Sequence, residues 1–255
     1  MGKYLYNKYF LSITGIFLFF ALWETITYLK VVKPVFLPSP IETLYGLFDL
    51  VKRGWLQNAV YHSIYRVFIA LVFVSLIGIG VGSLMGASKL ANGLLTGVIS
   101  GLKSIPATGF LGLIVLWFSI EERAKIIFLF LGSIFYMILL VRDSFRNTHN
   151  SDYEDVAKNL GATGFQLFRK VSFPAALPQI YNAVIISNSL MWTYIVLAEY
   201  INGNEEQSGI GYLIYISSRT QDSPKVFGLL MLIALLASAF DYILKMIKKK
   251  FIRWN

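Results

Sequence analysis

Residues 64–87 read IYRVFIALVFVSLIGIGVGSLMGA, and Arg66 is the only charged side chain among these 24 positions. About 20 apolar residues are enough for a helix to cross the hydrocarbon core of a bilayer. Lipid offers no partners for backbone N–H and C=O groups, so a single segment of this length has to cross as a helix. The stretch therefore predicts a transmembrane helix and an integral membrane protein.

Five more apolar segments of similar length flank this run, at residues 10–29, 94–118, 124–141, 180–201 and 225–247. The chain is 56% hydrophobic and 15% charged, whereas soluble domains carry about a quarter charged residues. We predict an all-α membrane protein with six transmembrane helices, organised as one transmembrane domain over residues 1–255. The first segment follows two lysines but precedes no small-residue cleavage site, so we interpret it as a retained helix and not as a signal peptide.

The lysines and arginines predict the orientation, because basic residues favour the cytoplasmic side of a membrane. With both termini inside, the inner side holds Lys3, Lys8, Lys89, Lys103, Arg142, Arg146, Lys158, Arg169, Lys170, Lys245, Lys248, Lys249, Lys250 and Arg253. The outer side then holds Lys30, Lys33, Lys52, Arg53, Arg66, Arg123, Lys125, Arg219 and Lys225. The net charge of +9 is thus explained by membrane flanks, and we predict no nucleic-acid partner.

Two of the connecting segments have a predicted structure of their own. The outer segment 30–63 begins with a proline-rich LPSP at 37–40, after which Ser39, Pro40 and Glu42 indicate a helix start. The alternating pattern that follows predicts an amphipathic helix over about 41–57, lying in the membrane interface. The long inner segment 142–179 carries two helical patterns on either side of Gly161, and is too structured for a plain connector.

Glycines recur every fourth residue at two places, which puts each set on one helical face where another backbone can approach closely. These glycines are Gly78, Gly82 and Gly86, followed by Gly93, Gly97 and Gly101. Each set is explained either by ordinary helix packing or by a helix that slides during transport.

Pro106 lies inside the segment 94–118, where proline removes a helical hydrogen bond and kinks the helix. Such a break either lines a pathway or is a simple kink between packed helices. Four polar or charged groups also lie within predicted spans, where they are costly: Glu24, Asn188, Glu199 and Asp241. We favour structural or gating roles for the carboxylates. The candidates for lining a translocation pathway are Pro106, Thr108, Ser187, Asn188, Trp192 and Glu199.

Chemistry within the chain is limited by its composition. It has no cysteine and two histidines far apart, so we predict no catalytic residues and no metal site. No GxxxxGK[ST] phosphate loop is present, so the chain lacks an ATPase of its own. Energy for transport would come from a partner subunit or from an ion gradient.

The segment 142–179 carries the most specific pattern. It reads DVAKNLGA at 155–162, FQLFRKV at 165–171 and FPAALP at 173–178. We expect a short helix that ends near Gly161, which can adopt a left-handed cap, and a second short helix that the two prolines stop. The result would be a helix–turn–helix knob that transmits movement from a soluble partner into the spans.

This segment resembles the EAA loop of ABC-importer permeases, which has Glu-Ala-Ala, three residues, Gly, nine residues, Ile, one residue and Leu-Pro. Asp155, Val156, Ala157 and Gly161 match the first part, with Asp for Glu and Val for Ala. Positions 171, 173 and 174 match the second part, with Phe for Leu at 173. Further stretches at 37–40, 105–107, 114–118, 177–178 and 209–213 are similar to the nitrate/sulfonate/taurine branch of this family, although Ser119 replaces its usual glycine.

The resemblance implies a permease subunit in the bacterial plasma (inner) membrane. It would have no enzyme activity of its own and would bind partner proteins on both sides of the membrane. Its partners would be a second permease copy, two ATPase subunits that hold ATP and Mg, and an extracytoplasmic binding protein facing residues 30–57 and 202–222. The residues implied in ATPase coupling are Asp155, Ala157, Gly161, Ala162, Phe165, Phe168, Val171 and Pro174.

The branch implies a small, anionic solute such as a sulfonate, taurine or nitrate. Relatives that carry thiamine precursors or other small nutrients leave a second substrate class open. An ion-coupled secondary transporter is the alternative from another class, but it would not require the knob at 155–178 and would more often show inverted repeats. A membrane-embedded enzyme would need a cluster of catalytic groups, which the spread of Glu24, Glu199 and Asp241 does not suggest.

Overall fold

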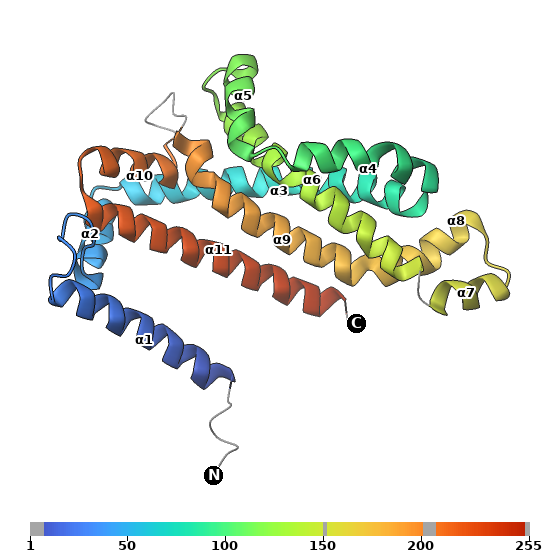
Figure 1. Ribbon diagram of the computed structural model, residues 1–255, viewed down its shortest axis with the longest axis horizontal. Coiled ribbons are helices and arrows are strands. Elements are labelled where there is room, and N and C mark those ends of the chain that lie inside the picture. Colours follow the sequence, from blue (N-terminus) through green and yellow to red (C-terminus); the bar gives the residue numbers. More distant parts are fainter. Residues whose placement is uncertain (1–7, 150–151, 201–207, 253–255) are drawn as a thin grey trace, which may run out of the picture.

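The computed structural model describes residues 8–149, 152–200 and 208–252, and these residues form helices joined by short turns, without a strand among them. Long helices that run along the main axis of the molecule make up most of it (Figure 1). Five are long and apolar enough to cross a membrane: Phe10–Tyr28, Trp55–Ala87, Glu122–Thr148, Gly164–Tyr200 and Ser223–Phe251. The prediction of an all-α membrane protein is confirmed.

The expected third span, residues 94–118, is not a single helix with a kink. Helix α4 (Lys89–Lys103) ends before Pro106, a 3-10 turn (Ala107–Phe110) follows, and α5 (Leu111–Phe118) leaves at 91° to α4. The amide of Ile105 already bonds the carbonyl of Leu102, and proline has no amide to restore the α-helical ladder. The described residues therefore contain five continuous helices long enough to span a membrane, or six if the bent pair is counted as one span.

Several spans are longer than their apolar cores. Helix α3 covers Trp55–Ala87, so it begins inside the interfacial helix expected over 41–57. That helix, α2, covers Pro40–Lys52 and starts with a complete capping box between Ser39 and Glu42, as its sequence indicates. Gly54, at φ +74°, forms the turn between them. Because α2 and α3 are joined so tightly, the outer connector is much shorter than residues 30–63.

The core of the bundle is the contact between α3 and α6 (Glu122–His149). A Cβ on Gly82 would lie 2.6 Å from Cβ of Val141, and one on Gly78 or Gly86 would collide with Met137 or Phe145. The first glycine set therefore permits close packing, as its spacing predicts. The second set differs, because a Cβ at Gly93, Gly97 or Gly101 on α4 would meet nothing within 4 Å.

The two ends of the bundle carry different short elements (Figure 1). At one end, here called the hairpin end, lie α7 (Asp152–Asn159) and α8 (Gly164–Leu167), while α1 (Lys8–Tyr28) ends and α11 (Ser223–Phe251) begins at the opposite end. At the other end, here called the α2 end, lie α2 and α10 (Ile210–Arg219). The surface expected over 202–222 is described only from Ser208 onward.

The expectation that two prolines stop the second helix of the knob is wrong. Helix α8 continues through a π-helical turn, Phe168–Ser172, into α9 (Phe173–Tyr200), so Gly164–Tyr200 forms one helical segment of 37 residues. Pro174 falls in the first turn of α9, and the amide of Phe173 reaches the carbonyl of Phe168 in the wider π pattern. The π turn thus absorbs the hydrogen bond that proline cannot make.

Candidate functional site

The hairpin of α7 and α8, residues 152–167, is anchored to the bundle by aromatic and polar contacts. The ring of Phe168 stacks on Phe145 of α6, with centroids 5.6 Å apart and planes at 8°, and also packs against Phe173. The buried carboxylate of Glu154 accepts a hydrogen bond of 2.6 Å from the Ser172 hydroxyl. The first contact packs the π turn against α6, and the second ties α7 to that turn, so the hairpin is held at the start of α9.

The tip of the hairpin presents apolar side chains to its surroundings. Leu160 is 83% exposed and Phe165 is 73% exposed, with Val156 beside them on α7 also exposed. Gly161 adopts φ +86°, the left-handed conformation expected for it, and the amide of Ala162 bonds the carbonyl of Ala157. Lone apolar side chains are common on surfaces, but a group of this kind on an otherwise polar hairpin indicates a contact surface.

The eight residues expected in coupling fall into two groups. Asp155, Gly161 and Phe165 are exposed at the tip, where the Asp155 carboxylate lies 3.4 Å from the Lys158 ammonium. The others are partly buried, either within the hairpin or in the π turn and the first turn of α9: Ala157, Ala162, Phe168, Val171 and Pro174.

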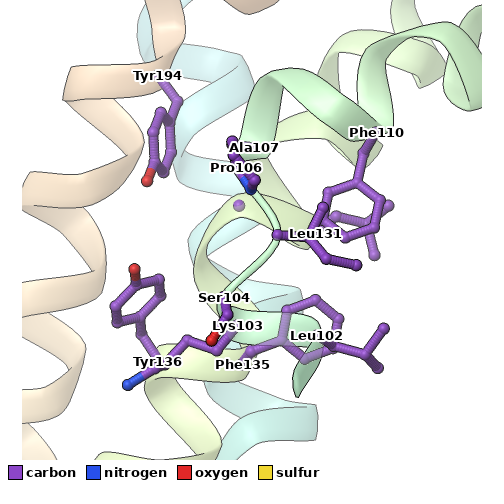
Figure 2. Close-up of a pocket in the computed structure, with 12 residues that line it drawn as sticks. Leu102, Lys103, Ser104, Pro106, Ala107, Phe110, Leu131, Phe135, Tyr136 and Tyr194 are labelled. Carbon is purple, nitrogen blue, oxygen red and sulfur yellow. The ribbon is translucent and has the colours of Figure 1, made fainter. Parts of the chain in front are cut away.

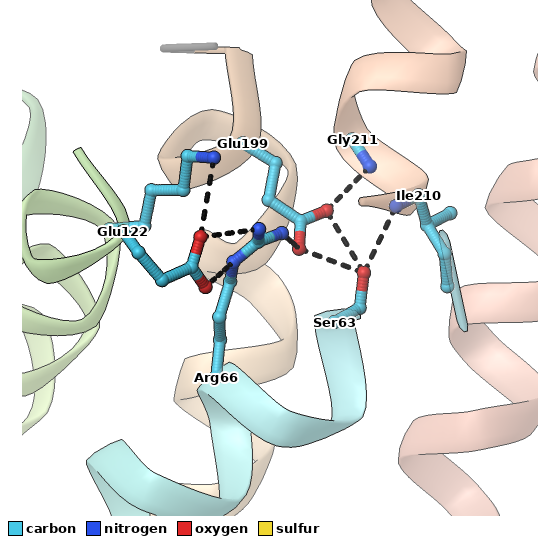
Figure 3. Close-up of polar contacts among 7 residues, drawn as sticks. Ser63, Arg66, Glu122, Glu199, Ile210 and Gly211 are labelled. Atoms are coloured by element: carbon cyan, nitrogen blue, oxygen red, sulfur yellow. Dashed lines mark hydrogen bonds and ion pairs between the residues drawn. The ribbon is translucent and has the colours of Figure 1, made fainter. Parts of the chain in front are cut away.

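A buried ion-pair cluster lies toward the α2 end (Figure 3). Arg66 of α3 is fully buried and binds two carboxylates, with Nη1 2.7 Å from Glu199 Oε1 and Nη2 2.7 Å from Glu122 Oε2. Glu199 also accepts hydrogen bonds from the Ser63 hydroxyl and from the amide of Gly211, at 2.8 Å and 2.7 Å. The cluster therefore joins α3, α6, α9 and α10.

Glu199 was expected as a structural, gating or pathway residue, and the structure places it 1% exposed in this cluster. Sequence reasoning missed Arg66 as its partner, Glu122 as the second carboxylate bound to Arg66, and Lys125, which lies 3.5 Å from Glu122. The signal was present in the sequence, because Arg66 is the one charge in residues 64–87 and a buried charge needs a partner. Nothing in the sequence said which acid it would meet.

Three other pathway candidates, Ser187, Asn188 and Trp192, are buried on α9 within this single chain. The Asn188 amide donates to Asp241 of α11 at 2.8 Å, and the Trp192 ring packs against Phe240 at 5.5 Å. Asp241 thus takes part in a contact between α9 and α11. Glu24, by contrast, is exposed on α1.

A cavity of about 290 Å3 lies beside the helix break, between the end of α4, the 3-10 turn, α6 and α9 (Figure 2). Pro106 lines it together with Lys103, Ser104, Tyr136 and Tyr194, while Thr108 is exposed nearby without lining it. The predicted break thus lies beside a partly polar cavity whose rim is exposed at the surface. Elsewhere in the described ranges, no three His, Cys, Asp or Glu side chains are grouped so that they could hold a metal ion.

A bundle of apolar spanning helices with a bent pair, a partly polar cavity and a protruding hairpin is typical of a transport permease. A family model described as "Binding-protein-dependent transport system inner membrane component" matches residues 75–253. The chain belongs to this family, and is therefore a multi-pass inner-membrane subunit of an ABC importer.

The chain is similar over nearly its whole length to curated permeases. It is 30% identical to the aliphatic sulfonates transport permease protein SsuC of Escherichia coli (strain K12), over 92% of this chain and 88% of that protein. It is 27% identical to the taurine transport system permease protein TauC of the same strain, over 96% and 90%. An inward-facing structure of the MetNI methionine ABC transporter shares the fold, with a TM-score of 0.66, 20% identity and coverage of 78% and 94%.

Proposed function

We propose that this permease carries a small anion, of the sulfonate, taurine or nitrate type, and that a partner ATPase drives the transport by docking on the α7–α8 hairpin. Two copies of the chain would assemble with two ATPase subunits, which hold the ATP and Mg, and with an extracytoplasmic binding protein. The hairpin end and both termini would face the cytoplasm. The α2 end, with α2 and α10, would then face the binding protein.

The observation that carries this proposal is the exposed apolar tip formed by Val156, Leu160 and Phe165 on a rigidly anchored hairpin. These side chains offer an apolar anchor of the kind that dominates binding energy at protein interfaces. The hairpin is continuous with α9 through the π turn, so a force on the tip reaches the membrane span directly. An ion-coupled transporter has no need for such an element.

The sulfonate and taurine permeases that the chain resembles support an anionic substrate. The cavity at the helix break is compatible with an anion, because its lining includes Lys103 and no carboxylate. Pro106 at that cavity is the best-placed of the predicted pathway residues. Ser187, Asn188, Trp192 and Glu199 would act by holding the helices that surround the pathway.

The docking proposal is tested by co-purification of the ATPase subunit with a tagged permease. Leu160→Asp combined with Phe165→Asp should abolish co-purification, since each places a charge in the apolar contact. Gly161→Pro should do the same, because proline cannot adopt the positive φ of this turn. Asp155→Lys reverses the charge at the tip and should also release the ATPase.

The matched controls are Leu160→Met with Phe165→Tyr, which keep large and largely apolar side chains at both positions and should retain the ATPase. Monodisperse elution in detergent verifies that each variant is inserted and folded. If the doubly charged variant still holds a full complement of ATPase, the hairpin is not the docking element.

A further inference from the structure

An apolar pocket of about 340 Å3 lies between α1 and the beginning of α11. All of its lining residues are apolar, among them Phe19, Leu22 and Ile26 of α1 and Phe227 and Leu230 of α11. Both helices are long and apolar enough to cross a membrane, so the pocket belongs to the part of the protein that lies in the bilayer. Its occupant therefore has to be apolar as well.

Trp23 joins the two helices at this pocket. Its ring contacts the ring of Phe227, with centroids 5.9 Å apart, and its indole N–H donates to the carbonyl of Pro38 at 2.9 Å. The one polar group of the side chain is thus satisfied within the chain, and the ring offers apolar surface to the pocket. Trp23 is buried, whereas most of α1 is exposed, so lipid or another protein chain has to surround this helix.

The length of α1 gives the depth of the pocket. Its apolar stretch Phe10–Tyr28 has 19 residues, or about 28 Å at 1.5 Å per residue, which only just spans a hydrocarbon core of about 30 Å. Tyr28 therefore lies at one boundary of this core, and the short helix leaves little room for tilt. Ile26 is then about 3 Å and Phe19 about 14 Å from that boundary. The pocket thus extends from the headgroup level toward the middle of the bilayer, as one acyl chain does.

Two lysines follow α1 at the headgroup level. Lys30, at φ +53°, turns the chain out of the helix, and the carbonyl of Lys33 accepts a hydrogen bond from the amide of Leu37, which lines the pocket. Both lysine side chains are exposed, and neither forms an ion pair within the residues that the structure describes. Asp222, just before α11, is already paired with Lys225 at 2.7 Å. Two positive charges are therefore free to attract an anionic headgroup.

A helix from a second copy of the chain is the other candidate for this place, but the pocket is too narrow for one. Phe19 and Ile26 are about 10 Å apart along the helix, so a volume of about 340 Å3 corresponds to a cross-section of about 30 Å2. A helix with its side chains is about 10 Å across, which is a cross-section of about 80 Å2. A partner helix could cover the mouth of the pocket without filling it, whereas a single hydrocarbon chain can enter.

We propose that this pocket binds one anionic phospholipid, with an acyl chain against Trp23 and the phosphate of the headgroup at Lys30 and Lys33. Each lysine near a membrane surface strengthens the binding of anionic lipid about fivefold. The apolar lining holds the chain but does not distinguish one headgroup from another, so the preference for an anion comes from the two lysines.

The test is quenching of Trp23 fluorescence by brominated lipid, with the full-length chain in vesicles. Trp55, Trp117, Trp192 and Trp254 are replaced by phenylalanine, which leaves Trp23 as the only tryptophan. Dibrominated phosphatidylglycerol is titrated into phosphatidylcholine vesicles, and dibrominated phosphatidylcholine into phosphatidylglycerol vesicles. The two quenching curves give the relative affinity of the two lipids beside Trp23. A second protein keeps only Trp117, which is 65% exposed on α5 outside the pocket and reports general lipid contact.

We expect phosphatidylglycerol to be favoured at least about tenfold beside Trp23, and much less beside Trp117. K30Q/K33Q should abolish the preference at Trp23, because it removes both charges. K30R/K33R should keep the preference, which separates charge from side-chain identity.

The pocket itself is tested by filling it. L22F/L230F adds bulk at two lining positions that are 62% and 46% exposed, and should weaken quenching of Trp23 by both lipids. The control L18F/L235F adds the same bulk at exposed positions that do not line the pocket, and should leave quenching unchanged.

Equal affinity for the two lipids, or a preference that K30Q/K33Q leaves intact, would overturn the proposal. So would a Trp23 that neither lipid quenches, since protein would then cover the pocket, or quenching that L22F/L230F does not change. Native mass spectrometry of the wild-type chain gives a second measurement that needs no tryptophan substitution. One phosphatidylglycerol should stay bound to the wild type and be lost from K30Q/K33Q, and a wild type that retains none would count equally against the site.

Discussion

The buried cluster around Arg66 predicts a large loss of stability from one substitution. Arg66→Met replaces the charged side chain with an unbranched apolar one. It therefore removes both ion pairs, to Glu199 and to Glu122. Glu122 still has Lys125 at 3.5 Å and is partly exposed, so it can remain charged at modest cost. Glu199 is 1% exposed and keeps the Ser63 hydroxyl and the Gly211 amide as hydrogen-bond donors, with Lys125 as the remaining nearby cation.

The size of the effect follows from this asymmetry. Two charges 4 Å apart interact by about 4 kcal/mol at an effective dielectric constant of 20. Removing one member of a buried pair costs about 3–5 kcal/mol, since the other is left uncompensated. We therefore expect Arg66→Met to lower the free energy of unfolding by about 3–5 kcal/mol. Glu199→Gln should cost less, because an amide oxygen can still accept from Ser63 and Gly211.

The assay is a double-mutant cycle on the purified permease in detergent, with unfolding followed by tryptophan fluorescence during titration with a denaturing detergent. Combining Arg66→Met with Glu199→Gln should cost clearly less than the sum of the two single losses, because the orphaned charge is gone. Arg53→Met, which removes an exposed ion pair with Asp49 at the protein surface, serves as the control and should cost little. A loss below about 1 kcal/mol for Arg66→Met, or strict additivity, would refute the role assigned to the cluster.

Three further predictions concern packing, the hairpin and pH. Gly82→Leu should destabilise the bundle by about 1–3 kcal/mol or more through overpacking against α6, whereas Gly80→Leu on the open face of the same helix should be nearly neutral in thermal unfolding. Ser172→Ala should increase hydrogen exchange in α7, because Glu154 loses its 2.6 Å hydrogen bond, and unchanged protection would contradict this anchor. Lys225 of α11 and Arg53 bind the Asp49 carboxylate on α2 and hold its pKa below the usual 3.8. This contact therefore stabilises the fold above about pH 4, and the stabilisation is lost as the pH falls further. The difference in melting temperature between wild type and Asp49→Asn should therefore shrink from pH 6 to pH 3, and a difference that grows would refute it.

The parts of the fold that depend on local chemistry could be predicted from the sequence. Apolar segments indicated the spanning helices, Ser39 and Glu42 marked the start of α2, and Gly161 marked the hairpin turn. Pro106 also marked the break, although a proline alone does not determine an angle of 91°. Pro174 shows the limit of such local prediction. Whether it ends the helix depends on whether the backbone can form a π turn just before it, and the residue type alone does not decide this.

The parts that depend on distant contacts could not be predicted. Arg66 and Glu199 are separated by 133 positions in the chain, and only the packing of α3 against α9 brings them together. Two glycine sets with the same spacing gave the same signal, yet a Cβ at Gly82 would collide with α6, whereas one at Gly97 would meet no described residue within 4 Å.

The continuity of the 37-residue segment from Gly164 to Tyr200 has a mechanical consequence. At 1.5 Å per residue it is a strut of about 55 Å, with one tip in the hairpin and the other one residue beyond Glu199. A shift of the hairpin along this axis would therefore reach the buried ion-pair cluster around Arg66 and Glu199 through continuous helix, without an intervening loop. The π turn at Phe168–Ser172 interrupts the regular α-helical winding of this segment. We expect rotation of the hairpin about the helix axis to be taken up there, whereas translation along the axis passes on to α9.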